Sequence, residues 1–116
     1  MSITPSYRAY VLDQVRQVVP ITSRPMFGGL TLFAEGLAFA LLAGDRLYFK
    51  VDDLNRAEYE TKGRGPFYPF GDTNKPMSYY ELPEEALEDV DELRPWVEGA
   101  IQVARRKARP KRKKGC

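Results

Sequence analysis

The sequence predicts a small α+β domain with two layers, in which an antiparallel sheet packs against helices. Three short apolar runs, at residues 30–33, 37–42 and 47–51, are separated by connections of three or four residues that each contain glycine. Such connections are typical of hairpins, so the runs predict an antiparallel meander. Apolar residues recur at helical spacing before and after these strands. At 116 residues, the chain can bury one core.

The first helix is expected to begin at Thr4 and Pro5, because threonine is a favoured N-cap and proline suits the first helical position. Its apolar stripe contains Tyr7, Val11, Val15 and Val18. Pro20 is expected to end this helix. Residues 21–25 are then expected to form a short connection rather than a strand.

A bulky apolar pair followed by two glycines comes next and is expected to be a structural motif. It consists of Met26, Phe27, Gly28 and Gly29. Paired glycines favour a backbone that turns sharply or is approached closely by another segment. A phosphate-binding loop is disfavoured, because the spacing matches neither common glycine motif and no helix follows.

The strands of the meander differ in which faces are apolar. The middle run is apolar on both faces, which predicts cover on both sides. The last run alternates, so Leu47, Phe49 and Val51 are expected to face the core. Tyr48 and Lys50 are expected to face outward.

The second half of the chain predicts a short helix, two further strands and a long final helix. The short helix spans about 54–62, with Gly63 as a left-handed C-cap. Extended segments follow at 67–70 and 75–82, and a helical turn begins at Pro83. The final helix is expected to begin at Asp89 or Asp91. Its apolar stripe is Leu93, Trp96, Val97, Ala100, Ile101 and Ala104.

Charge divides the chain into an acidic body and a basic end. The last dozen positions hold 8 of the 18 basic residues, which leaves 10 basic against 16 acidic residues before them. We expect a folded domain over 1–108 and a disordered basic tail over 109–116. The candidate nucleic-acid-binding residues are Arg105, Arg106, Lys107, Arg109, Lys111, Arg112, Lys113 and Lys114.

The composition excludes several common kinds of active site. The chain has no histidine, and its one cysteine is the final residue, Cys116. The usual zinc sites and the Ser-His and Cys-His nucleophile pairs are therefore excluded. Seven acidic residues between 81 and 92 lack the spacing of a calcium loop. We therefore expect no enzymatic activity, no metal and no cofactor.

Aromatic side chains gather before the final helix and in the third strand of the meander. Of these, Tyr48 and Tyr80, together with Lys50, are candidates for a protein interface. Stacking on single-stranded nucleic acid is an alternative, but few basic residues lie nearby. An enzyme built from tyrosine, arginine and carboxylate groups is a third hypothesis, for which the sequence supplies no geometry.

Several spaced motifs together resemble the N-terminal domain of the TfoX/Sxy family, whose full-length members regulate natural competence in bacteria. The matching segments are 24–29 (RPMFGG), 47–52 (LYFKVD), 66–67 (PF) and 77–83 (MSYYELP), with Trp96 and Ala100 in the final helix. The resemblance implies the element order α-β-β-β-α-β-β-α, in two layers like those of type III secretion chaperones. Competence regulators of the family carry a second, helical domain where this chain has its basic tail.

These observations predict a non-enzymatic regulatory or adaptor domain. The expected partner is a protein of the transcription machinery, with the basic tail adding contact with nucleic acid. The alternative is a chaperone-like homodimer that binds a peptide. No apolar run is long enough for a membrane span, and no signal peptide is recognisable, so a cytoplasmic location without membrane contact is expected.

Overall fold

A computed structural model of the chain describes residues 3–26, 29–66 and 78–108 and confirms the α+β class. Five antiparallel strands form one sheet in the order β1-β2-β3-β4-β5. The strands are β1 (Thr22–Met26), β2 (Gly29–Ala34), β3 (Leu37–Ala43), β4 (Arg46–Lys50) and β5 (Tyr79–Glu81). The helices are α1 (Pro5–Arg16), α2 (Arg56–Thr61), α3 (Glu84–Leu87) and α4 (Val90–Ala108).

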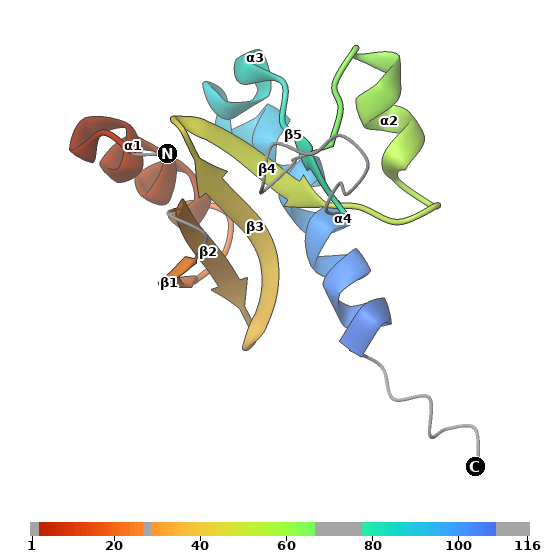
Figure 1. The fold of residues 1–116 in the computed structure, drawn as a ribbon, viewed down its shortest axis with the longest axis horizontal. Coiled ribbons are helices and arrows are strands. Elements are labelled where there is room, and N and C mark those ends of the chain that lie inside the picture. Colours follow the sequence, from red (N-terminus) through yellow and green to blue (C-terminus); the bar gives the residue numbers. More distant parts are fainter. Residues whose placement is uncertain (1–2, 27–28, 67–77, 109–116) are drawn as a thin grey trace.

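The helices and one face of the sheet enclose the main core, as the two-layer prediction requires (Figure 1). Helix α4 packs across β3 and β4, and α1 and α3 lie beside it. Most of the predicted helical stripes are buried here, including Val11 and Val15 of α1 and Val97 of α4, each 0% exposed. Burial of this continuous apolar surface is the dominant favourable contribution to the fold.

Strand β1 corrects the expectation that residues 21–25 form a connection. It pairs with β2 from Thr22 opposite Phe33 to Met26 opposite Gly29. Pro25 lies within it and cannot donate a backbone hydrogen bond. Because β1 is at the edge of the sheet, only one side of its backbone is paired and the proline is tolerated.

Both hairpins of the meander have loops of two residues, shorter than expected. Ala34 pairs with Leu37, so only Glu35 and Gly36 connect β2 to β3. Their φ angles are 57° and 75°. Gly44 and Asp45, both at 56°, connect β3 to β4 in the same way. Positive φ at both central residues is the signature of type I′ turns, whose twist matches that of the flanking strands.

A β-bulge explains how β3 is apolar on both faces. Leu32 pairs with Ala40 but Phe33 pairs with Ala38, so Phe39 is an extra residue in β3. Phe39 and Ala40 both belong to the main core, and Phe39 lies 6.0 Å from Phe49 between ring centroids. The bulge shifts the alternation by one residue, which places Leu41 on the opposite face.

Three helix termini follow the predicted signals, whereas α1 ends at Arg16, before Pro20. The Thr4 hydroxyl accepts a hydrogen bond from the amide of Tyr7 (3.4 Å), and the Asp89 carboxylate accepts one from the amide of Asp91 (2.9 Å). Gly63 has φ of 73° after α2, as a left-handed C-cap requires. The extended segment expected at 67–70 lies outside the described residues. Of the strand expected at 75–82, the described part is β5.

Candidate functional site

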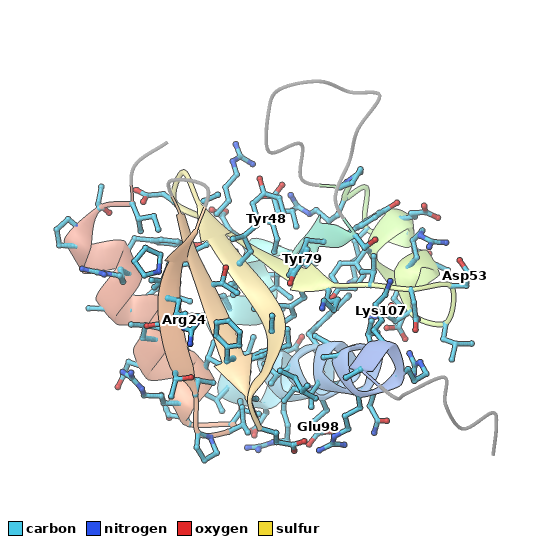
Figure 2. The ribbon with its side chains drawn as sticks, turned by 60° about the horizontal axis from the view of Figure 1, so that its bottom comes forward. Arg24, Tyr48, Asp53, Tyr79, Glu98 and Lys107 are labelled. Carbon is cyan, nitrogen blue, oxygen red and sulfur yellow. The ribbon has the colours of Figure 1, made fainter. Side chains whose placement is uncertain are left out.

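The sheet face away from the helices carries two of the three predicted interface residues. Leu41, Ala43 and Tyr79 form a small buried cluster on this face, and Tyr48 packs against it. Figure 2 shows Tyr48 and Tyr79 beside each other. Burial raises the pKa of the Tyr48 phenol, and the carboxylate of Glu81 adds to this effect. Tyr48 is therefore a neutral, partly buried side chain.

Lys50 lies on the same face and is partly buried. Its Nζ is 5.6 Å from the centroid of the Tyr79 ring, within the range of a cation–π contact. Burial lowers the pKa of the Lys50 ammonium, and the positive charge of Lys107 lowers it further. The ends of β4 and α4 thus bring two cations near each other.

Tyr80, the third predicted interface residue, lies on the helix face instead of sharing a surface with Tyr48 and Lys50. It packs against the main core, with its ring centroid 6.1 Å from that of Tyr59. Its hydroxyl donates a hydrogen bond to Glu60 (3.3 Å). Alternation along β5 causes this, because Tyr79 takes the face of Lys50 and Tyr80 must take the other.

Gly29, the last residue of the predicted structural motif, lies where β2 closely approaches β3. A Cβ atom added to Gly29 would lie 2.1 Å from the backbone oxygen of Leu42. Only glycine permits this approach of β2 to β3. Met26 pairs with Gly29 across the hairpin, whereas Phe27 and Gly28 lie outside the described residues.

The basic end of α4 is anchored to the rest of the domain by ion pairs. Arg105 binds Glu35 through two nitrogens, and Arg106 binds Asp52 at 2.8 and 3.0 Å. Hydrogen bonds from the two arginines lower the pKa of Glu35 and of Asp52. The exposed Lys107 forms no ion pair with any described residue. The other predicted nucleic-acid-binding residues, Arg109, Lys111, Arg112, Lys113 and Lys114, lie outside the described ranges.

The opposite end of α4 is acidic. Exposed carboxylates extend over α3 and the first turn of α4, and none of them forms an ion pair within the described part of the chain. They are Glu84, Glu85, Glu88, Asp89, Asp91 and Glu92. Negative charge is favourable at a helix N-terminus and positive charge at a C-terminus, so the helix dipole accounts for part of this arrangement.

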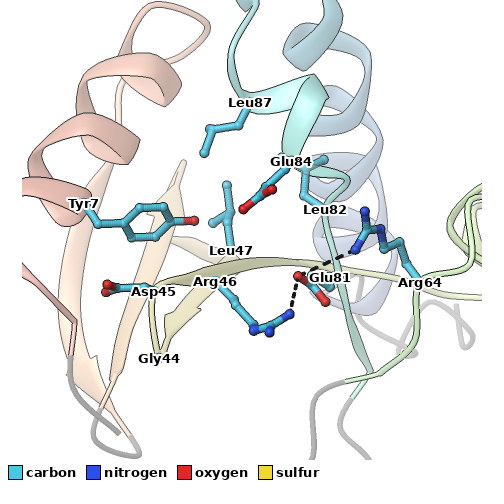
Figure 3. Close-up of a pocket in the computed structure, with 10 residues that line it drawn as sticks. All are labelled: Tyr7, Gly44, Asp45, Arg46, Leu47, Arg64, Glu81, Leu82, Glu84 and Leu87. Atoms are coloured by element: carbon cyan, nitrogen blue, oxygen red, sulfur yellow. Dashed lines mark hydrogen bonds and ion pairs between the residues drawn. The ribbon is translucent and has the colours of Figure 1, made fainter.

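A polar cavity of about 330 Å³ lies where α1, the β3–β4 turn, β5 and α3 meet (Figure 3). Residues from all four of these elements and from the segment after α2 line it. They are Tyr7, Gly44, Asp45, Arg46, Leu47, Arg64, Glu81, Leu82, Glu84 and Leu87.

Two guanidinium groups converge on one carboxylate in this cavity. The Nη1 atoms of Arg46 and Arg64 are 2.9 and 3.8 Å from the same oxygen of Glu81. The Nε of Arg64 is buried and has no hydrogen-bond partner among the described residues. Two cations and one anion leave a net positive charge with unused N–H donors, which is suited to binding an anionic group.

The side of the cavity formed by α1 and α3 is negative. Asp45 accepts hydrogen bonds from the amide (2.8 Å) and the hydroxyl (3.1 Å) of Thr4, which fixes the carboxylate beside α1. Tyr7 and Glu84 point toward each other (Figure 3). Burial raises the pKa of Tyr7 to about 12, with contributions from Glu84 and Asp45. The phenol therefore stays protonated at neutral pH and can donate a hydrogen bond.

The sequence does not predict this cavity, because its residues come from four separated stretches of the chain: Tyr7, 44–47, Arg64 and 81–87. Glu81 is one of the seven acidic residues between 81 and 92, and Arg46 and Arg64 belong to no recognised binding motif. A weak signal was present, since Gly44 and Asp45 predict a tight turn that brings α1 and β4 together. The arrangement offers charges and hydrogen-bond donors for binding. Among the described residues, no three His, Cys, Asp or Glu side chains are grouped to hold a metal ion.

Comparison with known proteins identifies the family of the domain. None of the described helices combines the length and apolar character needed to cross a bilayer. A search of curated proteins finds no match. The family model for the TfoX N-terminal domain matches residues 13–104, which cover the whole sheet, most of α4 and the last turn of α1. The chain therefore belongs to the TfoX N-terminal domain family.

Proposed function

We propose that this domain is a non-enzymatic regulatory adaptor that binds a protein partner of the transcription machinery and contacts nucleic acid through its basic C-terminal residues. Family membership supports a regulatory, competence-related domain. The finer assignment is supported by one structural observation, the separation of opposite charges along α4.

Helix α4 connects a surface of each sign. Its 19 residues span about 28 Å, since an α-helix rises about 1.5 Å per residue. Exposed carboxylates surround its first turn, and Lys107 lies in its last turn. Five more basic residues and no acidic ones follow Ala108 in the sequence. An adaptor needs two such distinct surfaces, because each class of partner is attracted by the opposite charge.

The nucleic-acid contact is expected to be electrostatic and independent of base sequence. Arg105 and Arg106 are already paired with Glu35 and Asp52, so phosphate must compete for them. Lys107 and the cations after Ala108 are therefore expected to supply most of the affinity. Binding through phosphates alone weakens steeply as salt is raised, because bound cations are released from the nucleic acid.

The first experiment measures binding of a fluorescent DNA duplex by anisotropy over a series of salt concentrations. Removal of residues 109–116 deletes five positive charges. The slope of log affinity against log salt should fall by about 4, since each phosphate contact contributes about 0.9. Lys62→Gln, which removes an exposed charge at the end of α2, is the matched control and should change little. An unchanged slope after truncation would refute the nucleic-acid assignment.

The second experiment tests the acidic surface as the protein-binding side. Affinity capture from the native cell with the full chain is compared with capture by a variant carrying Glu85→Gln, Glu88→Gln and Glu92→Gln, three exposed residues that do not line the cavity described above. Transcription proteins enriched by the wild type should be lost from the variant. If the wild type enriches no transcription factor or polymerase subunit, and deletion of the gene leaves transcription unchanged, the adaptor role is wrong.

A second candidate function is a homodimer that binds a peptide at the edge of the sheet. The observation that favours it is β1, whose residues Thr22 to Pro25 are exposed at the sheet edge. An extended peptide could add to this edge, although Pro25 removes one donor. Light scattering distinguishes this function, because a strict monomer excludes the homodimer.

A further inference from the structure

The polar cavity between α1, β4, β5 and α3 shares only Glu84 with the surfaces assigned above to partners. It has a volume of about 330 Å³, near the lower limit of about 300 Å³ for small-molecule sites. Leu47, Leu82 and Leu87 contribute an apolar wall, and each is at most 4% exposed. The cavity therefore combines a buried apolar wall with charged groups.

The charges of the cavity are segregated. Arg46 and Arg64 share Glu81 on the side of β5, where one positive charge remains after pairing. Glu84 lies on the side of α1 and α3, near the phenol of Tyr7, and has no ion pair with any described residue. A ligand that is complementary to both sides must carry an anionic group and a cationic group.

Two details define the anionic subsite. The Arg64 side chain is 30% exposed and its Nη1 is 3.8 Å from Glu81, beyond hydrogen-bond distance, so its terminal N–H groups are available to a ligand. The Arg46 side chain is 59% exposed, so the subsite is open to solvent on that side. A planar carboxylate can accept parallel hydrogen bonds from a guanidinium group. Multiply charged anions are disfavoured because Asp45, Glu81 and Glu84 also line the cavity.

We propose that this cavity binds a small zwitterion of the size of an amino acid or dipeptide, with its carboxylate on Arg46 and Arg64 and its ammonium group facing Glu84 and Tyr7. The Tyr7 phenol oxygen can accept a hydrogen bond from the ammonium group, and the ring offers an aromatic face beside it. The leucine wall accepts an aliphatic side chain. Ligand occupancy would link α1 to β5 and α3, which makes the domain a sensor of a small metabolite as well as an adaptor.

The test uses the full chain and glycyl-L-leucine as the probe, with L-leucine as a shorter zwitterion. Two-dimensional NMR should show shifts of the amides of Asp45, Arg46 and Leu82, with a dissociation constant of about 1 mM or tighter. Two capped probes separate the charges. N-acetyl-glycyl-L-leucine lacks the ammonium group and glycyl-L-leucinamide lacks the carboxylate, and each should bind at least about tenfold more weakly. Inorganic phosphate should bind more weakly than the dipeptide.

Variants assign the two subsites. Arg64→Gln should weaken the binding of glycyl-L-leucine by about tenfold or more. Glu84→Gln should weaken binding of glycyl-L-leucine but leave binding of the N-acetylated probe unchanged. A loss of folding cannot produce this pattern, because it would weaken both probes. Arg56→Gln is the matched control, because Arg56 pairs with Asp53 outside the cavity.

Three results would overturn the proposal. The first is the absence of amide shifts with either zwitterion at about 10 mM. The second is equal binding of the capped and free dipeptides. The third is amide shifts confined to residues outside the cavity. Each leaves the DNA and partner experiments unaffected, because those depend on the two ends of α4.

Discussion

Arg106, in the last turns of α4, binds Asp52, the second residue after β4, through two hydrogen bonds of 2.8 and 3.0 Å. Asp52 also accepts a hydrogen bond from the amide of Leu54 (2.9 Å), so the same carboxylate organises the turn that leads to α2. Arg105 forms an equivalent contact with Glu35 in the β2–β3 turn. Two adjacent arginines thus fix the end of α4 to two turns of the sheet.

These ion pairs predict a loss of stability in acid. The folded state lowers the pKa of Glu35 below 4.5 and that of Asp52 below 3.8, through hydrogen bonds from the arginines. A carboxylate with a depressed pKa contributes stability above its unfolded pKa and loses it as pH falls through the folded value. We expect the melting temperature to fall from about pH 5 to about pH 3.

One double variant tests whether Glu35 and Asp52 cause the loss of stability in acid. Glu35→Gln with Asp52→Asn should be less stable than wild type at neutral pH and should lose less of its stability between about pH 5 and about pH 3. Because both pairs are partly exposed, salt should weaken them. An acid profile identical to that of wild type would show that other carboxylates control the transition.

Tyr59→Phe is expected to stabilise the domain. The Tyr59 side chain is 1% exposed, and its buried hydroxyl has no hydrogen-bond partner within the described part of the chain. Phenylalanine keeps the edge contact with Trp96, whose ring centroid is 4.7 Å away, and removes the unsatisfied group. We expect a gain of about 1 kcal/mol in the free energy of unfolding, measured by denaturant titration. Tyr10→Phe, at a position 41% exposed, is the control and should be neutral.

Alkaline pH is expected to unfold the protein progressively. Burial raises the pKa of Tyr7 to about 12 and also raises that of Tyr59. Above the ordinary value of 10.0, the unfolded state loses these protons first, so the folded state becomes less favourable as pH rises. The free energy of unfolding should therefore decrease between about pH 10 and about pH 12. A Tyr7→Phe and Tyr59→Phe double variant should show a flatter profile, and an equally steep one would contradict this assignment.

Gly29→Ala should destabilise the fold severely. The added Cβ would lie 2.1 Å from the Leu42 backbone oxygen, so β2 and β3 would have to separate. We expect a loss of about 3 kcal/mol or more, measured by thermal unfolding with circular dichroism. Gly65→Ala is the matched control, because no atom lies within 4 Å of its added Cβ. A loss at Gly29 no larger than at Gly65 would mean that the strands adjust without strain.

Strands β1 and β3 have features that local sequence patterns do not predict. The apolar runs and glycine turns predict the meander, and the capping residues Thr4 and Asp89 predict the starts of two helices. β1 contains Pro25, and a proline is compatible with a strand mainly at a sheet edge. Whether a strand lies at an edge depends on the order of strands, which local sequence patterns do not give. Likewise, the bulge at Phe39 depends on pairing with β2 and reverses which face Leu41 occupies.

The sequence by itself determined the α+β class, the family, the absence of histidine chemistry and the opposite charges of body and tail, since these depend on composition and short-range spacing. Tertiary structure decided which charges are available. It paired Arg105 and Arg106 with distant carboxylates, placed Tyr80 on the helix face, and brought Arg46, Arg64 and Glu81 together in one cavity. Such contacts join residues far apart in the chain, so they exist only after the sheet and helices have packed.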